Sequence, residues 1–207
     1  MARVGDTRTK ILEVAEADFA AEGYAGAHLQ KIAEQVGVRK TALYYYFDSK
    51  AALYTSVLDT ILEAFEQSIA KVLDPDEAPD RQLELLAVRL NDLMAEHPTY
   101  ARILFRLFVD PQPPEVARVF PHVERVVERV LFFYRRGVDA GVFQKRSARH
   151  FFQSAFGMFL FHYAAPAFAS RVLGVEDVFT SENVGWRREE VLALLRDGIL
   201  ARPRGGE

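Results

Sequence analysis

The first fifty residues carry apolar side chains three and four positions apart, which is the spacing of one face of an α-helix. The pattern forms three short runs, at 7–22, 29–36 and 41–47. Gly23 and Gly37 follow the first two runs, and glycine readily takes the left-handed backbone that often ends a helix. Thr7 is a candidate N-cap of the first run. We therefore predict three short helices, the second and third joined by a tight turn.

The remainder of the chain has the same helical periodicity in longer runs. Asp48 and Ser49 are candidate caps for the first of these, and proline-containing loops separate several of the others. We expect these helices at about 49–69, 82–96, 100–109, 115–136, 147–169 and 187–201. No segment alternates with period two between hairpin turns. The sequence therefore predicts an all-α protein of about nine helices.

Composition removes several classes of function. The chain has 207 residues, of which 50% are hydrophobic, and a formal net charge of -3, so it is neither disordered nor a polycation. It has 0 Cys, which excludes disulfide scaffolds, thiolate metal sites and cysteine nucleophiles. Its 5 His lack metal-ligand spacing, and there is no Ser-His-Asp arrangement or phosphate-binding glycine loop. We expect no metal, no cofactor, no catalytic residues and no enzymatic activity.

One segment, 151–169, approaches the length that crosses a bilayer. It contains Gln153, Ser154, His162 and Pro166, so we interpret it as a helix buried within protein. The first residues show no apolar export signal. We therefore expect no membrane partner and a cytoplasmic location, which the absence of cysteine also fits.

The two short helices around Gly37 form a helix-turn-helix, in which the second helix enters the DNA major groove. Leu43 and Phe47 lie four residues apart and can pack into the core, which leaves the other positions of this helix facing outward. Residues 1–50 hold as many acidic as basic residues, but 39–50 hold three basic residues against one acidic. The basic charge is concentrated where the helix would meet DNA.

Each outward residue of the second helix has a chemistry suited to DNA. Thr41 can contact a thymine methyl group or a base edge, and Arg39 or Lys40 can reach guanine O6 and N7. The hydroxyl groups of Tyr44 and Tyr45 can donate to phosphate oxygens. The alternative is ordinary packing of consecutive tyrosines. We expect all five residues to contact DNA.

Three further residues are candidate phosphate contacts. Lys50 lies in the first turn of a helix, where the helix dipole disfavours a cation, so its presence indicates an external anion such as a DNA phosphate. His28 and Gln30 lie near the start of the supporting helix and can meet a flanking phosphate. Tyr46, beside Phe47, is interpreted as a core residue.

These positions together resemble the DNA-binding domain of the TetR family of transcriptional regulators, over about residues 7–53. The matching residues are Phe19-Ala20, Gly23-Tyr24, Ile32-Ala33, Gly37-Val38, Leu43-Tyr44, Tyr46-Phe47, Ser49-Lys50 and Leu53. The resemblance implies a DNA-binding domain at 1–48 and a helical ligand-binding and dimerisation domain at 49–207. Arg39, Ala27-His28 and Ala42 stand where the family often has small hydroxyl residues, so the N-caps of the two helices are unusual.

The larger domain is rich in aromatic residues: fifteen of the chain's 25 lie between Tyr100 and Phe168. Some of them could line a cavity for an apolar or aromatic ligand, with His162 as a hydrogen-bonding group for its polar end. The alternative is that they are ordinary core residues and that His162 is a satisfied core or interface histidine. The candidate ligand-binding residues are Phe105, Phe108, Phe132, Phe133, Phe156 and His162.

The last two long helices, at 147–169 and 187–201, carry apolar residues on more than one face. Each could therefore pack against its own domain and against a second copy of the chain, in a four-helix interface. The resemblance implies such a homodimer, which would place two recognition helices on a palindromic operator. We expect a repressor released from DNA by a small apolar or aromatic effector. An activator, a regulator without an effector, and a helical carrier or enzyme for apolar molecules remain open.

Overall fold

The computed structural model describes residues 4–200, which form ten α-helices and one short 3-10 helix. No strand occurs among these residues, so the predicted all-α class is confirmed. None of the helices in this range is long and apolar enough to cross a membrane. The helices are α1 (Val4–Gly26), α2 (Leu29–Val36), α3 (Lys40–Tyr46), α4 (Lys50–Ala70), α5 (Pro79–Glu96), α6 (Pro98–Val109), η1 (Pro114–Val119), α7 (Phe120–Asp139), α8 (Ala148–Ala164), α9 (Pro166–Leu173) and α10 (Ser181–Ile199).

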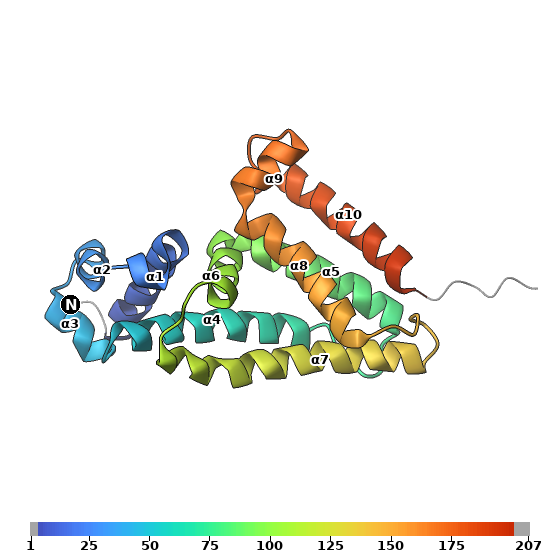
Figure 1. Ribbon diagram of the computed structural model, residues 1–207, viewed down its shortest axis with the longest axis horizontal. Coiled ribbons are helices and arrows are strands. Elements are labelled where there is room, and N and C mark those ends of the chain that lie inside the picture. The colour runs from blue at the N-terminus through green and yellow to red at the C-terminus, as the bar shows by residue number, and fades with distance from the viewer. Residues whose placement is uncertain (1–3, 201–207) are drawn as a thin grey trace, which may run out of the picture.

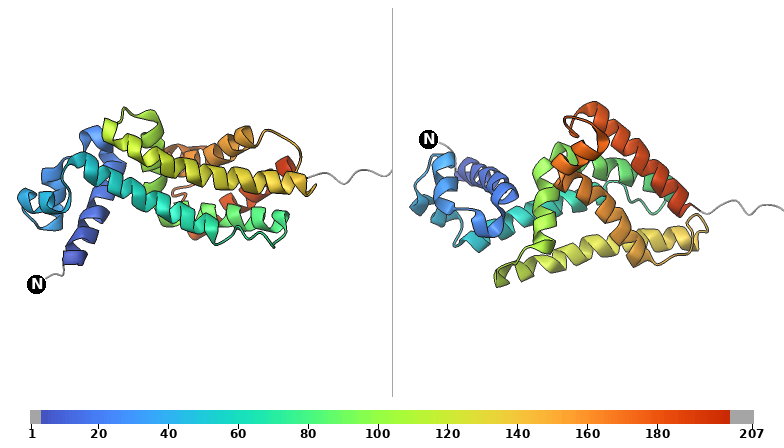
Figure 2. Two further views of the ribbon diagram at one scale, coloured as in Figure 1. Left: turned by 90° about the horizontal axis from the view of Figure 1, so that it is seen from below. Right: turned by 45° about the horizontal axis from the view of Figure 1, so that its top comes forward.

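Helices α1, α2 and α3 lie together at one end of the molecule (Figure 1). Helix α4 runs from this end along the molecule, beside α7, and the left view of Figure 2 shows the same pairing. Helix α6 packs against α1 on one side and α8 on the other, while α5 packs against α10. The small N-terminal unit is therefore joined to the larger one through α4 and α6.

The ends of the N-terminal helices follow the signals in the sequence. Gly23 has φ 73° and Gly37 has φ 84°, both in the region that glycine occupies without a steric cost. The backbone N–H of Gly37 donates to Ala33 and Glu34, which closes the end of α2. The Ser49 hydroxyl accepts a hydrogen bond from the Ala52 N–H at 3.0 Å, so the predicted cap of α4 is confirmed.

Several predicted boundaries were wrong, and the predicted helix 115–136 is divided into η1 and α7. Helix α1 begins at Val4, so Thr7 lies inside the helix and does not cap it. The predicted helix 147–169 is divided into α8 and α9 at Pro166, because proline lacks the N–H that would continue the ladder. Helix α10 begins at Ser181 instead of 187, with the Thr180 hydroxyl accepting from the Asn183 N–H at 3.3 Å.

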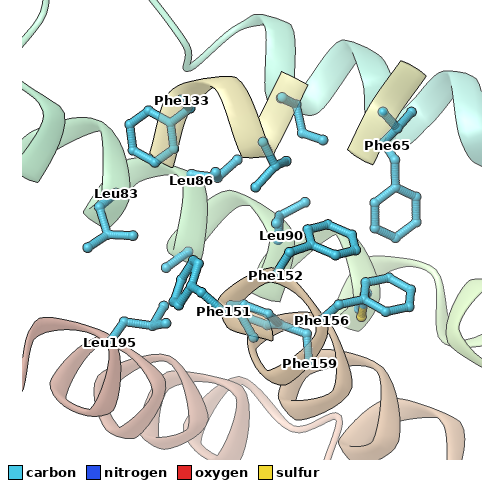
Figure 3. A pocket seen from close by; sticks show the side chains of 16 residues that line it. Phe65, Leu83, Leu86, Leu90, Phe133, Phe151, Phe152, Phe156, Phe159 and Leu195 are labelled. Carbon is cyan, nitrogen blue, oxygen red and sulfur yellow. The ribbon is translucent and has the colours of Figure 1, made fainter. Parts of the chain in front are cut away.

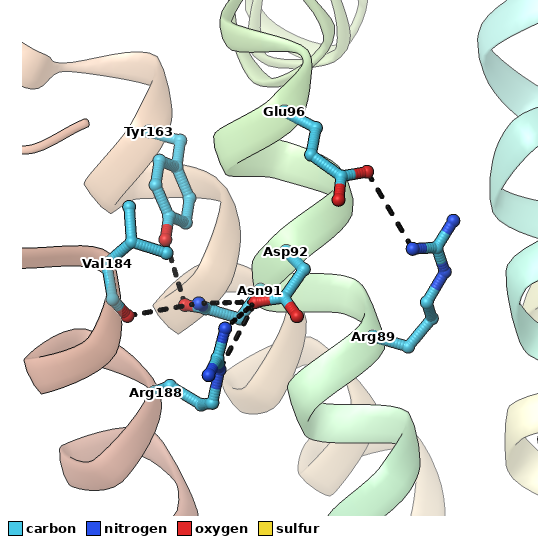
Figure 4. A network of polar contacts seen from close by, with 7 residues as sticks. All are labelled: Arg89, Asn91, Asp92, Glu96, Tyr163, Val184 and Arg188. Atoms are coloured by element: carbon cyan, nitrogen blue, oxygen red, sulfur yellow. Dashed lines mark hydrogen bonds and ion pairs between the residues drawn. The ribbon is translucent and has the colours of Figure 1, made fainter. Parts of the chain in front are cut away.

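A polar network inside the larger unit holds α5, α8 and α10 together (Figure 4). The Tyr163 hydroxyl donates to Asn91 Oδ1 at 2.9 Å, and Asn91 Nδ2 donates to the Val184 carbonyl at 3.3 Å. Arg188 on α10 pairs with Asp92 on α5 at 2.6 Å. Because Asn91 is fully buried, both hydrogen bonds are needed to offset its desolvation.

Candidate functional site

Helix α3 divides into a buried face and an exposed face. Leu43 is fully buried and Phe47, which follows the helix, is 4% exposed, as their spacing predicted. Tyr45 is 80% exposed, so it contributes little to the core. The residues on the exposed face are Lys40, Thr41, Tyr44 and Tyr45. A basic, hydroxyl-bearing and aromatic surface is therefore presented to solvent by a helix whose opposite side is packed.

The contacts between α1 and α2 hold this helix in place. Lys31 pairs with the buried carboxylate of Asp18 at 2.6 Å, and this hydrogen bond raises the pKa of Lys31. Lys10 on α1 donates to the Val36 carbonyl at the end of α2, at 3.0 Å. The turn between α2 and α3 is thus supported from α1, and the direction of α3 is set by the fold.

The candidate DNA contacts His28, Gln30 and Arg39 are exposed. His28 and Arg39 occupy the N-cap positions of α2 and α3, and neither side chain caps its helix. This agrees with the unusual caps expected from the sequence, and it leaves both side chains available to an external ligand. Gln30 donates to Glu34 on its own helix at 2.7 Å.

Lys50 has partners inside the chain, which the sequence did not indicate. Its Nζ donates to the Ala25 carbonyl at 3.1 Å and lies 4.8 Å from the centre of the Tyr24 ring. Partial burial lowers the pKa of Lys50. These contacts account for a cation at the start of α4 without an external anion, and its contact with DNA stays a prediction.

Arg8 is a residue of the same surface that sequence reasoning missed. It is exposed on α1, and its guanidinium lies 5.2 Å from the centre of the Phe47 ring. The only signal in the sequence was a basic residue near the N-terminus, which does not distinguish a DNA-facing side chain from a solvated one. The fold places it beside the end of α3.

The larger unit contains an apolar cavity of about 80 Å³ between α4, α5, α7, α8 and α10 (Figure 3). Its lining among the described residues has no polar side chain. Ten of the lining residues are aliphatic, and α5 supplies half of these. The phenylalanines of the lining are Phe65, Phe133, Phe151, Phe152, Phe156 and Phe159. Burial without any hydrogen-bonding group suits a hydrocarbon and excludes a polar group from the interior.

The structure brings together only part of the set predicted to line a cavity. Phe133 and Phe156 line it, and Phe108 lines a groove on its outer side. Phe105 and Phe132 are exposed at the surface and His162 is buried elsewhere, so these three do not line the cavity. The contribution of α5 was missed because the apolar residues on one face of this helix have the same spacing whether they line a cavity or pack in the core.

His162 is buried against α10 without a hydrogen bond to its Nε2. Burial, with a smaller contribution from the nearby Arg187, lowers the pKa of His162 to about 4. The ring is therefore neutral at pH 7. His162 does not line the cavity, and its unpartnered Nε2 also differs from the satisfied histidine of the alternative, so its contact with a ligand stays a prediction.

Comparison with known proteins agrees with this arrangement. Residues 11–57 match the family described as "Bacterial regulatory proteins, tetR family". The chain is 33% identical over 135 residues to the HTH-type transcriptional repressor SCO4008 of Streptomyces coelicolor, a match that covers 64% of this chain and 67% of that protein. The chain belongs to the TetR family. It is a DNA-binding transcriptional regulator, as the α3 surface predicted.

Other TetR-family relatives extend the comparison. The HTH-type transcriptional repressor NicS of Pseudomonas putida is 34% identical over 98 residues, which cover 47% of this chain and 46% of NicS. The expectation that the chain is not an enzyme agrees with the names of these relatives.

Solved structures share the fold over nearly the whole chain. The ketosteroid transcriptional regulator KstR2 of Mycobacterium tuberculosis has a TM-score of 0.76 and 17% identity, covering 97% of this chain and 98% of that one. AibR, solved with isovaleryl coenzyme A and operator DNA, has a TM-score of 0.74 and 16% identity, covering 91% and 97%.

Proposed function

We propose that this TetR-family regulator is a homodimeric repressor that a small ligand with an apolar group releases from a palindromic operator. The observation that carries the proposal is the pairing of two features in one chain. An exposed basic and tyrosine-rich face on α3 suits DNA, and an apolar cavity in the larger unit suits a ligand. For a ligand in the cavity to change DNA binding, packed contacts must connect the cavity to α1, α2 and α3.

The predicted homodimer has support from exposed apolar residues on the last helices. Phe161 on α8, and Trp186 and Leu194 on α10, are large, apolar and exposed in the single chain. A two-fold interface formed by these helices would remove each of these side chains from water in both copies. Leu194→Glu should therefore shift the protein toward monomer in light scattering after size exclusion.

The cavity has a packed connection to the DNA-binding helices. The Phe156 ring, which lines the cavity, meets the Phe108 ring on α6 edge-on with centroids 6.1 Å apart. Two residues earlier on α6, Arg106 donates to the Ala21 carbonyl of α1 at 2.9 Å. A ligand that moves Phe156 would therefore shift the position of α6, which packs directly against α1.

The nature of the effector is supported by the cavity and by two solved relatives. KstR2 is named for ketosteroids, and AibR was solved with isovaleryl coenzyme A, so both of these neighbours are linked to ligands with large apolar parts. The apolar lining of this cavity fits the same kind of group. We propose an apolar or aromatic effector on these grounds.

The test is selection of DNA from a random duplex pool by the purified protein, followed by titration of the selected duplex at several salt concentrations. We expect a palindrome with half-sites about one helical turn apart. Lys40→Ala should lower the salt slope by about 1, because one phosphate or base contact is lost. Lys71→Ala, an exposed lysine at the far end of α4, is the matched control and should leave the slope unchanged.

The DNA assignments fail if Lys40→Ala, Tyr44→Ala and Tyr45→Ala all bind the selected duplex as tightly as the unchanged protein. Recovery of a single half-site with no symmetry would contradict the homodimer and leave DNA binding in place.

A further inference from the structure

One side of the apolar cavity is closed by a pair of parallel aromatic rings. The rings of Phe152 and Phe156 are stacked with centroids 5.7 Å apart and an interplanar angle of 8°. Both side chains are half-buried. Figure 3 shows Phe65, Phe152 and Phe156 together on one side of the cavity, with Leu83 and Leu195 on the opposite side. Phe133 and Phe151 lie on that opposite side as well, so aliphatic side chains are gathered with two phenylalanines there, and the side formed by Phe65, Phe152 and Phe156 is the one shared with the outside.

The same three phenylalanines also line an outer groove of about 780 Å³ between α4, α6, α7 and α8. The polar residues of this groove lie on α7 and α8 and are Glu124, Glu128, Arg149 and Gln153. A wall of phenylalanine side chains therefore separates a space without polar side chains from a groove that offers charged and hydrogen-bonding groups. Rotation of half-buried rings can join the two spaces.

We infer that the effector is an amphipathic molecule with an aliphatic chain. The end of the chain enters the inner cavity past Phe152 and Phe156, and the polar end remains in the outer groove. This inference rests on the proposed function, which it narrows from an apolar or aromatic ligand to an aliphatic one. Ala87 and Ala155, the smallest residues of the lining, determine how deeply the chain enters.

The inner cavity is smaller than the space that an aromatic ring needs. A cavity of about 150 Å³ is known to hold benzene, so the 80 Å³ here holds roughly three carbon atoms. Replacing alanine with leucine adds three carbon atoms to the side chain, which is enough to fill this space. Each buried methylene changes affinity by about fourfold, so a filled cavity should weaken binding of a long chain by about 60-fold.

The experiment measures binding of 1-alkanols from butanol to dodecanol to the full chain by isothermal titration calorimetry. We expect affinity to rise with chain length, by about fourfold for each methylene that becomes buried. We also expect 1-decanol to bind more tightly than 4-phenyl-1-butanol, which has the same number of carbons but ends in a ring. Ala87→Leu and Ala155→Leu should each weaken 1-decanol binding by about 60-fold.

Two further substitutions distinguish a change in the cavity from a loss of folded structure. Ala167→Leu, at an exposed position on α9, is the matched control and should leave the series unchanged. Phe152→Ala opens the wall, so it should strengthen binding of dodecanol relative to butanol. Circular dichroism of each variant verifies that the helices are retained.

The inference is overturned if no alkanol binds, if the ring-ended alcohol binds as tightly as 1-decanol, or if neither leucine variant weakens 1-decanol binding. Release of the selected operator is measured in the same samples and tests the proposed function separately. Chain-dependent binding that leaves DNA bound would retain the inference and refute effector release. If the alcohols release DNA equally from the unchanged protein and from both leucine variants, effector release is retained and the inference is refuted.

Discussion

Replacement of Gly23 by alanine should destabilise the protein through two separate effects. The backbone there has φ 73° and ψ 176°, a region that only glycine occupies readily, and an L-residue costs about 1–3 kcal/mol. A Cβ at this position would also lie 2.7 Å from Arg106 Nη1 and 3.3 Å from Asp110 Oδ2. The guanidinium would have to move from its place against α1.

The second effect can be worked out from the contacts of Arg106. Its Nη2 donates to the Ala21 carbonyl at 2.9 Å, and its Nη1 pairs with Asp110 at 3.2 Å. The side chain is about one third exposed, so we assign about 1 kcal/mol to the displaced contacts. Gly23→Ala should therefore cost about 2–4 kcal/mol in total.

A double-mutant cycle in urea separates the two effects. In an Arg106→Ala background the clash is absent, so Gly23→Ala should cost about 1 kcal/mol less than in the unchanged protein. Gly37→Ala is the matched control, because Gly37 also has a positive φ but no atom lies within 4 Å of its Cβ position. Its cost should be about 1–2 kcal/mol in both backgrounds.

Additive costs for Gly23→Ala and Arg106→Ala would show that the guanidinium does not lie against this backbone. A cost for Gly23→Ala below about 0.5 kcal/mol would refute the strain argument as well.

Three other perturbations have definite expected outcomes. His162 has a pKa of about 6.5 in the unfolded chain and about 4 in the fold, so between these values only the unfolded chain binds the proton and stability falls as pH falls. From pH 7 to 5 the free energy of unfolding should decrease by about 2 kcal/mol. Urea unfolding of His162→Gln should lack that decrease. Gly137→Ala places a methyl group 2.0 Å from the buried Phe143 ring, so thermal unfolding should show a cost of about 1–3 kcal/mol, whereas a gain would contradict the packing. Leu43→Ala should cost about 2–5 kcal/mol and weaken operator binding, and an unchanged urea midpoint would contradict its burial.

The fold was predictable in class and in most of its elements because the helices are amphipathic and their ends carry local signals. Gly23, Gly37 and Ser49 each act through their own backbone or side chain, so their effects are visible in sequence. The division at Pro166 was missed because apolar residues continue on both sides of it. Periodicity reports which face is buried and does not report where the axis of a helix changes direction.

The candidate DNA surface was more predictable than the apolar cavity. The outward face of α3 follows from the positions of Leu43 and Phe47 on a single short helix, so local spacing is sufficient. Lys50 shows the limit of this reasoning: its partner Ala25 is 25 residues away in sequence, and only the packing of α4 against α1 brings them together. Arg8 was missed for the same reason.

By itself the sequence determined the all-α class, the short helix α3 and the residues that α3 exposes, because each depends on contacts within a few turns of one helix. Tertiary structure alone decided which aromatic residues surround the cavity. Phe133 and Phe156 line it while Phe105 and Phe132 are exposed, although all four have the same side chain. The difference arises because a cavity is enclosed by helices that are distant in sequence, and their packing, not the chemistry of any one residue, determines which side chains meet.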